Sequence, residues 1–358
     1  MRQWQSVFSG PYGFELEQDG DIPTLRMHTM TWFPRQIPYL NYWLWVRNGL
    51  MLYRRYVKAY GTPDVVHAHG MIYGGLLAWN IKRRYGVPFV ITEHGTAYAR
   101  NLFAPWELKV AAKAAAAADY RLAVSEAFCH EMAQFLGSQW EACPNVVSPA
   151  FTNYSLPPSS LPAPEEKRPF VFTMVAYLSV RKGIHHLISA FAQSFKGDET
   201  TLLRIGGDGQ ERDRLEALAE ELGVTSQVEF LGALDRHEVR DLMARTDAFV
   251  LSSRYETFGV VVIEALALGK PVISTRCGGP NRVVQSQDGL LIPPEDVAAM
   301  AKAMRYLKDH IDDYDSQAIR QSCIDRFGES AIASQLDGIY GAVTQSKNTA
   351  KKLAGTYA

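Results

Sequence analysis

Two glutamates carry the clearest chemical signal in the sequence. Glu256 and Glu264 are separated by seven residues in the segment ETFGVVVIE. An apolar run ending at Ser252 predicts a buried strand, followed by a loop and a helix that starts near Gly259. Backbone N–H groups at such a helix start form an anion site. A diphosphate could bind there, while both carboxylates accept hydrogen bonds from sugar hydroxyls on either side of it. This arrangement suits a nucleotide sugar. Alternatively, the two glutamates have no ligand, with one carboxylate in solvent and the other capping the helix.

Two further motifs follow predicted strands of the same half. Lys182 and Gly183 follow the strand at 170–175, where an ammonium group can neutralise a leaving phosphate. The alternative is a surface lysine that begins a helix. The segment RIGGDG predicts a glycine-rich turn, in which Gly207 allows a close backbone approach to a ligand or serves an ordinary turn. It is not a dinucleotide-binding fingerprint, because Arg212 stands where a third glycine is required.

The elements that must position these residues alternate between short apolar runs and helical patterns. This alternation predicts an α/β fold with parallel sheets covered by helices on both faces. The predicted strands are 64–69, 88–92, 120–125, 170–175, 201–205, 228–231, 247–252 and 271–275. Strong helical patterns lie between them, including the alanine-rich run after Pro105 and a helix capped by Ser125. Each strand leads into a loop at its carboxyl end, which is where the motifs gather.

A proline-rich stretch without apolar periodicity divides the chain. We expect a first Rossmann-like domain at 1–154, a linker at 155–168, a second domain at 169–345 and a polar tail at 346–358. A chain of 358 residues is long enough for two domains of about 150 residues each.

Charge and cysteine content exclude several classes of function. The formal net charge of -1 provides no broad positive field, so we expect no nucleic-acid partner. The four cysteines have no C-x-x-C spacing, which argues against a zinc site or a disulfide framework and favours a reducing cytoplasm. No stretch approaches the roughly 20 consecutive apolar residues of a membrane span.

The segment 37–60 mixes tryptophans with basic residues. Trp43 and Trp45 stand near Arg47, Arg54 and other basic residues, a composition found in segments that lie on a bilayer surface. The favoured interpretation is a core helix with a basic outer rim. The alternative is a peripheral contact with the inner face of the plasma membrane.

Several motifs, taken in order, resemble one family. The series LSVRKG, IGGDGQERDRLEALAEELG, VEFLGAL, ETFGVVVIEALALGKPVIS and GLLIPPED is similar to the donor domain of the family-4 retaining glycosyltransferases. PDVVHAHG, PFVITEHG and LAVSEAF are similar to the acceptor domain of that family, especially in enzymes of bacterial capsular, exopolysaccharide and cell-wall polysaccharide assembly. The resemblance covers nearly all of 60–340 and implies the GT-B architecture, with two facing Rossmann-like domains.

The resemblance also implies roles for individual residues. Glu256 matches the acid that holds the transferred sugar, and Glu264 matches the acid that binds the ribose. Lys182 matches the lysine on the diphosphate, while Phe258 and Gly259 match the helix start beneath it. These matches identify the donor side of the site.

His94, in TEHG, matches the histidine of the family's active site. His67 and His69 lie at period two on one strand, so a metal site with His94 is an alternative. We expect no metal, because no carboxylate or cysteine completes the ligand set. We also expect no cofactor, since the nucleoside-diphosphate sugar is itself the donor substrate.

The sequence departs from the family pattern in two places that bear on function. Tyr177 stands where the family commonly has a phosphate-neutralising arginine, and Arg181 is a candidate substitute. The family also begins with a strand, a glycine-containing loop and a helix, and nothing like them precedes Val7. We therefore expect the first βαβ segment to be missing.

Together these observations predict a retaining glycosyltransferase of bacterial surface polysaccharide synthesis. The expected donor is a nucleoside-diphosphate sugar, and the expected acceptor is a glycan or a lipid-linked molecule. The alternatives are a truncated, non-catalytic nucleotide-sugar binder and a sugar-nucleotide epimerase or phosphorylase on the same fold.

Overall fold

The computed structural model describes residues 13–29, 38–155 and 168–356. Contacts between residues divide the chain into two compact units. The first unit takes in Met1–Leu122, Met132–Trp140 and Gly338–Ala358, and the second takes in Ala123–Glu131 and Glu141–Asp337. The domain boundaries expected from the sequence stay a prediction, although the expected tail overlaps helix α14 (Glu329–Thr356).

The first half of the chain is built around a four-stranded sheet with the order β3-β4-β5-β6. β3 and β4 are parallel, with Val66 opposite Phe89. A separate antiparallel hairpin, β1 and β2, turns at Gly20. The elements are β1 (Gly13–Asp19), β2 (Ile22–His28), α2 (Pro38–Tyr60), β3 (Val66–His69), a π-helix η1 (Gly70–Gly75), α3 (Leu76–Tyr85), β4 (Phe89–Glu93), α4 (Pro105–Ala117), β5 (Tyr120–Ala123), α5 (Glu126–Leu136), β6 (Glu141–Ala142) and α6 (Pro149–Thr152).

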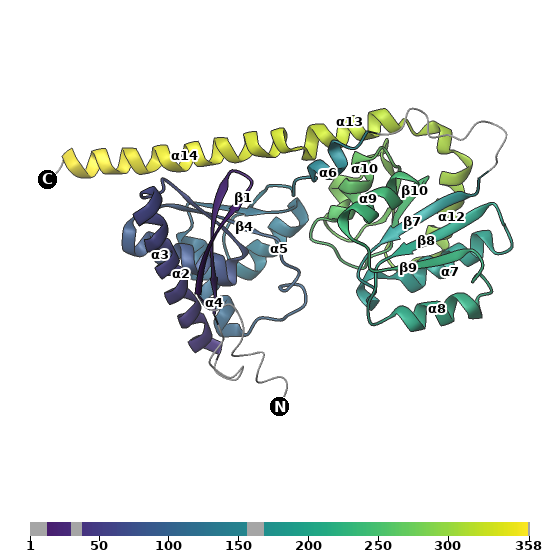
Figure 1. The fold of residues 1–358 in the computed structure, drawn as a ribbon, viewed down its shortest axis with the longest axis horizontal. Helices are drawn as coiled ribbons and strands as arrows, with labels where there is room; N and C mark the ends of the chain where they lie inside the picture. Colours follow the sequence, from purple (N-terminus) through teal and green to yellow (C-terminus); the bar gives the residue numbers. More distant parts are fainter. Residues whose placement is uncertain (1–12, 30–37, 156–167, 357–358) are drawn as a thin grey trace. The chain divides into compact units, whose positions relative to one another are not determined.

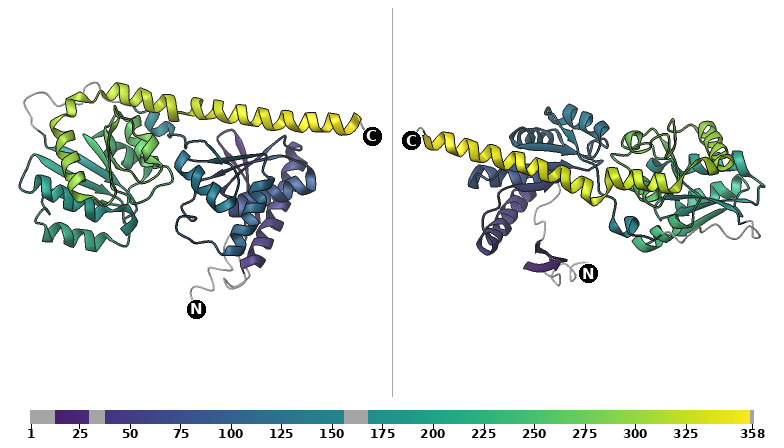
Figure 2. Two further views of the ribbon diagram at one scale, coloured as in Figure 1. Left: turned by 180° about the vertical axis from the view of Figure 1, so that it is seen from behind. Right: turned by 90° about the horizontal axis from the view of Figure 1, so that it is seen from above.

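The second half forms a six-stranded, fully parallel sheet with the order β12-β11-β10-β7-β8-β9. Helices lie on both of its faces (Figures 1 and 2). The elements are β7 (Phe170–Val175), η2 (Val180–Lys182), α7 (Ile184–Phe195), β8 (Thr201–Gly206), α8 (Arg212–Glu221), β9 (Val228–Gly232), α9 (Arg236–Ala244), β10 (Ala248–Leu251), α10 (Val260–Ala267), β11 (Val272–Thr275), α11 (Pro280–Val283), β12 (Gly289–Ile292), α12 (Val297–Asp309), η3 (Ile311–Asp313), α13 (Ser316–Phe327) and α14.

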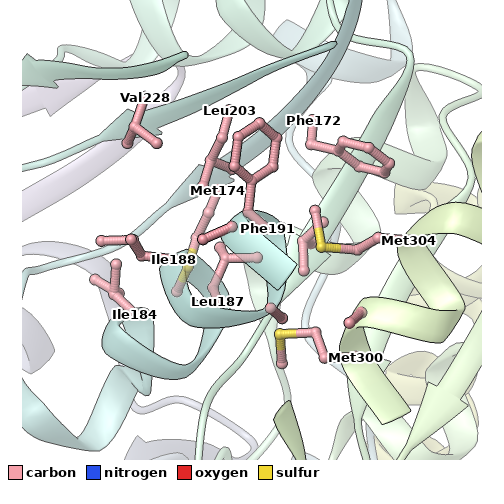
Figure 3. Packing of buried hydrophobic residues seen from close by; sticks show 14 of the residues in the cluster. Phe172, Met174, Ile184, Leu187, Ile188, Phe191, Leu203, Val228, Met300 and Met304 are labelled. Carbon is pink, nitrogen blue, oxygen red and sulfur yellow. The ribbon is translucent and has the colours of Figure 1, made fainter. Parts of the chain in front are cut away.

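The main core of the second unit lies between this sheet and the helices α7, α8 and α12. Phe172, Met174 and Leu203 project from the strands onto Phe191 of α7 and Met304 of α12, as Figure 3 shows. All five side chains are fully buried. Burial of large apolar side chains stabilises a domain by about 1.5 to 3 kcal/mol each, so this core fixes the strand ends that carry the site.

The structure confirms the expected α/β class with parallel sheets. Among the described residues, no helix has the length and apolar character needed to span a membrane.

Candidate active site

The site of the second unit lies at the carboxyl edge of its sheet, where the strand order reverses. β7 has β8 on one side and β10 on the other. The chain leaves β7 toward β8 and leaves β10 toward β11, so the loops after β7 and β10 diverge. Ligands of open α/β sheets bind in the crevice that such diverging loops leave. Lys182 ends the short helix η2 in the connection after β7, and Glu256 lies on the loop after β10.

Lys182 and Glu256 meet across this crevice. Lys182 Nζ donates to Glu256 Oε1 at 2.5 Å, and Ser253 Oγ donates to the same oxygen at 2.7 Å. The two side chains are only 16% and 11% exposed. The backbone of Glu256 is also fixed, because its N–H donates to Cys277 O at 2.8 Å and its carbonyl accepts from Gly279 N at 2.8 Å. The pair is therefore a mostly buried and positioned cation–anion contact.

Glycines let the loops approach one another at this edge. A Cβ at Gly183 would lie 2.1 Å from Ser252 O, and a Cβ at Gly207 would lie 1.9 Å from Ala176 O. Both residues have positive φ, +63° and +124°. Only glycine fits both restrictions, so the turn after β8 lies directly against the loop after β7.

Helix α10 begins at the same edge. Gly259 has a φ of +93° and caps the helix, so the backbone turns sharply before Val260. Phe258 is 3% exposed, and its ring contacts Phe327 edge to face with centroids 5.8 Å apart. The Phe258 side chain therefore anchors the helix start in the core, and only its backbone is left to act toward a ligand. The first N–H groups of α10 supply a partial positive charge there.

Glu264 lies farther along α10 and is almost fully buried. Burial raises the pKa of its carboxyl to about 7, and the nearby Arg236 guanidinium opposes this rise. Arg236 Nη2 lies 3.7 Å from Glu264 Oε1. Near neutral pH this carboxyl is thus able to accept hydrogen bonds in its ionised form and to donate one in its neutral form.

A cavity of about 750 Å³ adjoins the glycine-rich turn. Its wall includes Tyr177, Gly207 and Val261, together with polar Asp208 and Gln210. The volume falls in the range of ~300 to 1,000 Å³ that small-molecule sites occupy. The cavity is large enough for a nucleoside.

The first unit holds the remaining predicted residue, His94, just after β4. His69 Nδ1 lies 2.9 Å from His94 Nε2, and the two rings stack with centroids 5.1 Å apart. His67 stacks on His69 and is held by Thr92 at 2.7 Å and by the Tyr340 hydroxyl at 2.6 Å. These contacts fix a column of three imidazoles at the end of β3 and β4.

Burial, with smaller contributions from the neighbouring His69 and His94, lowers the pKa of His67 to about 4. The pKa of His69 is lowered by burial and by His94. Both rings are therefore neutral at pH 7. Where the ring nitrogens of His69 and His94 meet, one donates and the other accepts, so His69 constrains the tautomer of His94.

Glu93 fixes the backbone beside His94. It is 5% exposed, and its carboxylate accepts from Met71 N at 2.7 Å and from the N–H groups of His94 and Gly95 at 2.9 Å each. These bonds satisfy the buried charge and hold the loop after β4 in one conformation.

The structure gathers the predicted donor residues at one edge of the second sheet and places His94 in the other unit. No group of three His, Cys, Asp or Glu side chains in the described ranges is arranged to hold a metal ion. The sequence does not reveal Ser253, Arg236 or Tyr340 as contacts of the site residues. Ser253 stands three residues before Glu256 and offers a local signal, whereas Tyr340 is 273 positions from His67 and offers none.

Comparisons with known proteins match both halves of the chain. The family described as Glycosyltransferase Family 4 matches residues 6–151, and the family described as Glycosyl transferases group 1 matches residues 161–320. A Mycobacterium tuberculosis glycogen synthase is 38% identical over 136 residues, which are 38% of this chain and 33% of that protein. The Rhizobium meliloti lipopolysaccharide core biosynthesis glycosyltransferase LpsE is 39% identical over 140 residues, 39% of each chain.

Among solved structures, Anabaena HepE in complex with UDP is similar, with a TM-score of 0.69 and 22% identity over 82% of each chain. That likeness shows the fold. The aligned part of this chain spans 33% and 39% of the lengths of the two curated relatives.

Proposed function

Since the chain belongs to the glycosyltransferases of group 1 and family 4 and has their GT-B fold, we propose that it is a retaining glycosyltransferase. It moves a sugar from a nucleoside-diphosphate sugar to a glycan or lipid-linked acceptor of bacterial surface polysaccharide. The observation that carries the proposal is the Lys182–Glu256 contact in the crevice of the second sheet, beside the start of α10 and next to a cavity of nucleoside size.

Lys182 and the start of α10 stabilise the departing nucleoside diphosphate. Negative charge grows on the phosphate as the bond to the sugar breaks, and preorganised positive groups lower the barrier most at that stage. Arg181 is the second cation of the proposal. Its Nη1 is buried and has no hydrogen-bond partner among the described residues, so a phosphate oxygen would satisfy it. This set of positive groups supplies charge stabilisation without a divalent metal.

Glu256 fixes hydroxyls of the transferred sugar, and Glu264 accepts from the ribose. Glu256 already accepts two hydrogen bonds on Oε1, which leaves Oε2 for a ligand hydroxyl. Ribose hydroxyls would donate hydrogen bonds to the nearly buried Glu264 carboxyl. Gly207 lets the backbone of the turn approach the nucleotide. The nucleoside lies in the adjoining cavity, and a uridine nucleotide is the first to test because HepE is described with UDP.

His94 acts on the acceptor side, near the reacting carbon of the sugar. The column of His67 and His69 holds its ring in one orientation. Orientation of a reacting group is worth several powers of ten in rate, so a fixed imidazole is better suited to this role than a mobile one.

The polysaccharide setting and the compartment are also proposals. LpsE is described as an enzyme of lipopolysaccharide core biosynthesis, which supports a surface-glycan acceptor. All four cysteines are free and buried, as is usual in a reducing cytoplasm, and we place the reaction there.

The test is a transfer assay with an anomeric readout. The purified chain is incubated with UDP, GDP and ADP sugars and with lipid-linked or glycan acceptors, and both nucleoside diphosphate release and the anomeric proton of the first product are followed by NMR. We expect acceptor-dependent release, a product with the anomeric configuration of the donor, and loss of most turnover in Glu256→Gln. Arg214→Gln, an exposed change on α8, is the matched control.

Three results would contradict the proposal. An inverted product would exclude the retaining mechanism. Conversion of the donor sugar without an acceptor would favour the epimerase. Binding of a nucleotide sugar without any turnover would favour the non-catalytic binder.

A further inference from the structure

A second hollow of the second unit lies at the amino edge of its sheet, opposite to the edge that carries the candidate site. Its volume is about 500 Å³, and its wall includes Pro169, Thr246 and Lys270, which stand just before β7, β10 and β11. Val171 of β7 lines this hollow, whereas Val175 at the other end of the strand lines the cavity beside the glycine-rich turn. At about 3.3 Å per residue, the two valines are roughly 13 Å apart along the strand. A ligand in this hollow would therefore be separate from a nucleotide at the candidate site.

Every charged residue in the wall of this hollow is basic. We call the hollow the amino-edge pocket, and its basic residues are Arg168, Arg204, Arg245 and Lys270. Arg168 donates to both carboxylate oxygens of Asp247, at 2.7 and 2.5 Å, and Arg204 donates to Glu229 at 2.7 Å. Arg245 and Lys270 form no ion pair with a carboxylate within 13–29, 38–155 and 168–356, the ranges that the structure describes. Two of the four positive charges are thus left without a counter-charge, which favours an anionic ligand.

The ordinary role of a cation at a helix end explains Arg245 better than Lys270. Arg245 ends α9, where a positive charge interacts favourably with the helix dipole. Lys270 follows α10, whose last carbonyls already accept other hydrogen bonds. The carbonyl of Ala265 accepts from backbone N–H groups, and that of Ala267 accepts from the Arg320 guanidinium. The end of α10 therefore does not require the Lys270 ammonium.

Lys270 is a cation in surroundings that disfavour its charge. Burial lowers the pKa of its ammonium, the Asp247 carboxylate opposes this change, and the Arg168 guanidinium adds to it. Asp247 is already engaged, because it accepts from Arg168 and, at 2.8 Å, from the N–H of Val171. An anion bound in the pocket would offset the cost of keeping Lys270 charged.

Other contacts hold the wall of the amino-edge pocket in place. Thr246 is 1% exposed, and its hydroxyl donates to the carbonyl of Val171 at 2.9 Å. The carbonyl of Tyr154 accepts from Arg320 at 3.2 Å, and the Arg240 guanidinium carbon lies 4.9 Å from the centre of the Tyr154 ring. A wall that is fixed before a ligand arrives loses less conformational entropy on binding. The pocket is therefore a preorganised cavity with an aromatic side.

We propose that the amino-edge pocket binds a small phosphomonoester, whose phosphate group contacts Lys270 and Arg245. A phosphomonoester carries about 1.5 to 2 negative charges at pH 7, which matches the two cations without a carboxylate partner, whereas a single carboxylate would neutralise only one. The volume of the pocket falls in the range of ~300 to 1,000 Å³ that small-molecule sites occupy. The esterified group therefore lies inside the pocket as well, with the Tyr154 ring as an apolar wall. This binding goes beyond the transfer reaction and needs neither donor nor acceptor.

The experiment is a calorimetric titration of the full chain with glycerol 3-phosphate, inorganic phosphate and glycerol, in a phosphate-free buffer. We expect both phosphates to bind and glycerol not to bind. Lys270→Gln should weaken the binding of glycerol 3-phosphate roughly 10- to 100-fold, the effect of losing a charge-assisted hydrogen bond. Arg245→Gln alters an exposed side chain and should also weaken it. Lys302→Gln makes the same change as Lys270→Gln at an exposed position of α12 and should bind as the parent does.

A further comparison separates this pocket from the candidate site at the opposite edge of the sheet. Lys182→Ala should keep the affinity for glycerol 3-phosphate, and Lys270→Gln should keep the affinity for any nucleoside diphosphate that the parent binds. Circular dichroism checks that each variant is folded. Failure of the transfer assay would leave this measurement unaffected, because it uses no sugar donor.

Four outcomes would overturn the proposal. The first two are a folded parent that binds neither phosphate, and equal affinities in Lys270→Gln and Lys302→Gln. The third is binding that Lys182→Ala abolishes and Lys270→Gln retains, which would place the phosphate at the carboxyl edge of the sheet. The fourth is binding that is found only in Glu165→Gln/Glu166→Gln, which would show that these two carboxylates of the chain compete for the pocket.

Discussion

The Lys182–Glu256 pair should stabilise the second domain far more than an exposed ion pair does. The variant Lys182→Met tests this, because it removes the ammonium group and keeps the apolar part of the side chain. Removing one partner of a buried pair costs about 3 to 5 kcal/mol, because the other charge is left buried. Ser253 still donates to Glu256 in this variant. We therefore expect a loss near the lower end, about 3 kcal/mol of the free energy of unfolding.

A double-mutant cycle separates the pair from its surroundings. Glu256→Gln alone should also destabilise the domain, and the double variant Lys182→Met/Glu256→Gln should be little worse than either single variant. The coupling energy should then be about 2 to 3 kcal/mol, as for residues in direct contact. The matched control is Arg204→Met, which breaks the 2.7 Å contact with Glu229 on the same sheet. Because those side chains are 28% and 43% exposed, we expect a loss below about 1 kcal/mol.

Denaturant unfolding followed by circular dichroism gives these values. All seven tryptophans lie at or before Trp140, so tryptophan fluorescence reports on the first half of the chain and should not change in these variants. A Lys182→Met variant within about 0.5 kcal/mol of the parent would refute the reasoning, since exposed substitutions have effects of that size.

Three further predictions concern single positions. Gly207→Ala places a Cβ 1.9 Å from Ala176 O at a φ of +124° and should lower the free energy of unfolding by about 1 to 3 kcal/mol. The control Gly197→Ala has a φ of +80° and nothing within 4 Å of the new Cβ, so it should cost less. Equal losses in denaturant unfolding would rule out the clash. The pKa of Glu264 near 7 predicts that nucleoside diphosphate affinity falls as the pH drops below 7, because the ionised carboxylate accepts from the ribose. Calorimetry should show that this part of the pH dependence disappears in Glu264→Gln, and an unchanged profile would remove Glu264 from the ribose site. His67 should destabilise the first domain in acid, because the unfolded chain binds a proton below a pH of about 6.5 and the folded chain only near 4. The free energy of unfolding should fall by roughly 2 kcal/mol across this pH window after allowance for partial exposure. A His67→Gln variant whose free energy of unfolding has the same pH dependence as the parent would contradict the assignment of this effect to His67.

Local patterns in the sequence predict most of the strands. β7 occupies Phe170–Val175, as expected, and β3 forms Val66–His69 within the expected 64–69. These strands are short apolar runs bounded by polar or turn residues, so their positions depend on neighbouring residues alone. The π-helix at Gly70–Gly75 was not predicted. The N–H group of Met71, the second residue of this helix, donates to the carboxylate of Glu93 at the end of β4. This is a tertiary contact that no local pattern contains.

The candidate site shows the same division. The motifs around Lys182 and Glu256 place each residue after a strand, but their direct contact joins loops that are 74 positions apart and depends on the order of the strands in the sheet. The chemistry of His94 was expected from its motif. The sequence brought His69 and His94 together only as an alternative metal site. Their direct ring-to-ring contact requires two neighbouring parallel strands to end at the same level, which no local pattern contains.

The most direct test of the central claim is a calorimetric titration of the full chain with UDP, GDP and ADP and with their sugars. Because the second unit has a positively lined crevice beside a cavity of nucleoside size, one nucleoside diphosphate should bind. Lys182→Ala should weaken that binding by about 1.5 to 3 kcal/mol, the value of a charge-assisted hydrogen bond, while Lys302→Ala on α12 should not. A folded chain that binds none of these nucleotides, or binds one equally well without the Lys182 ammonium, would contradict the account.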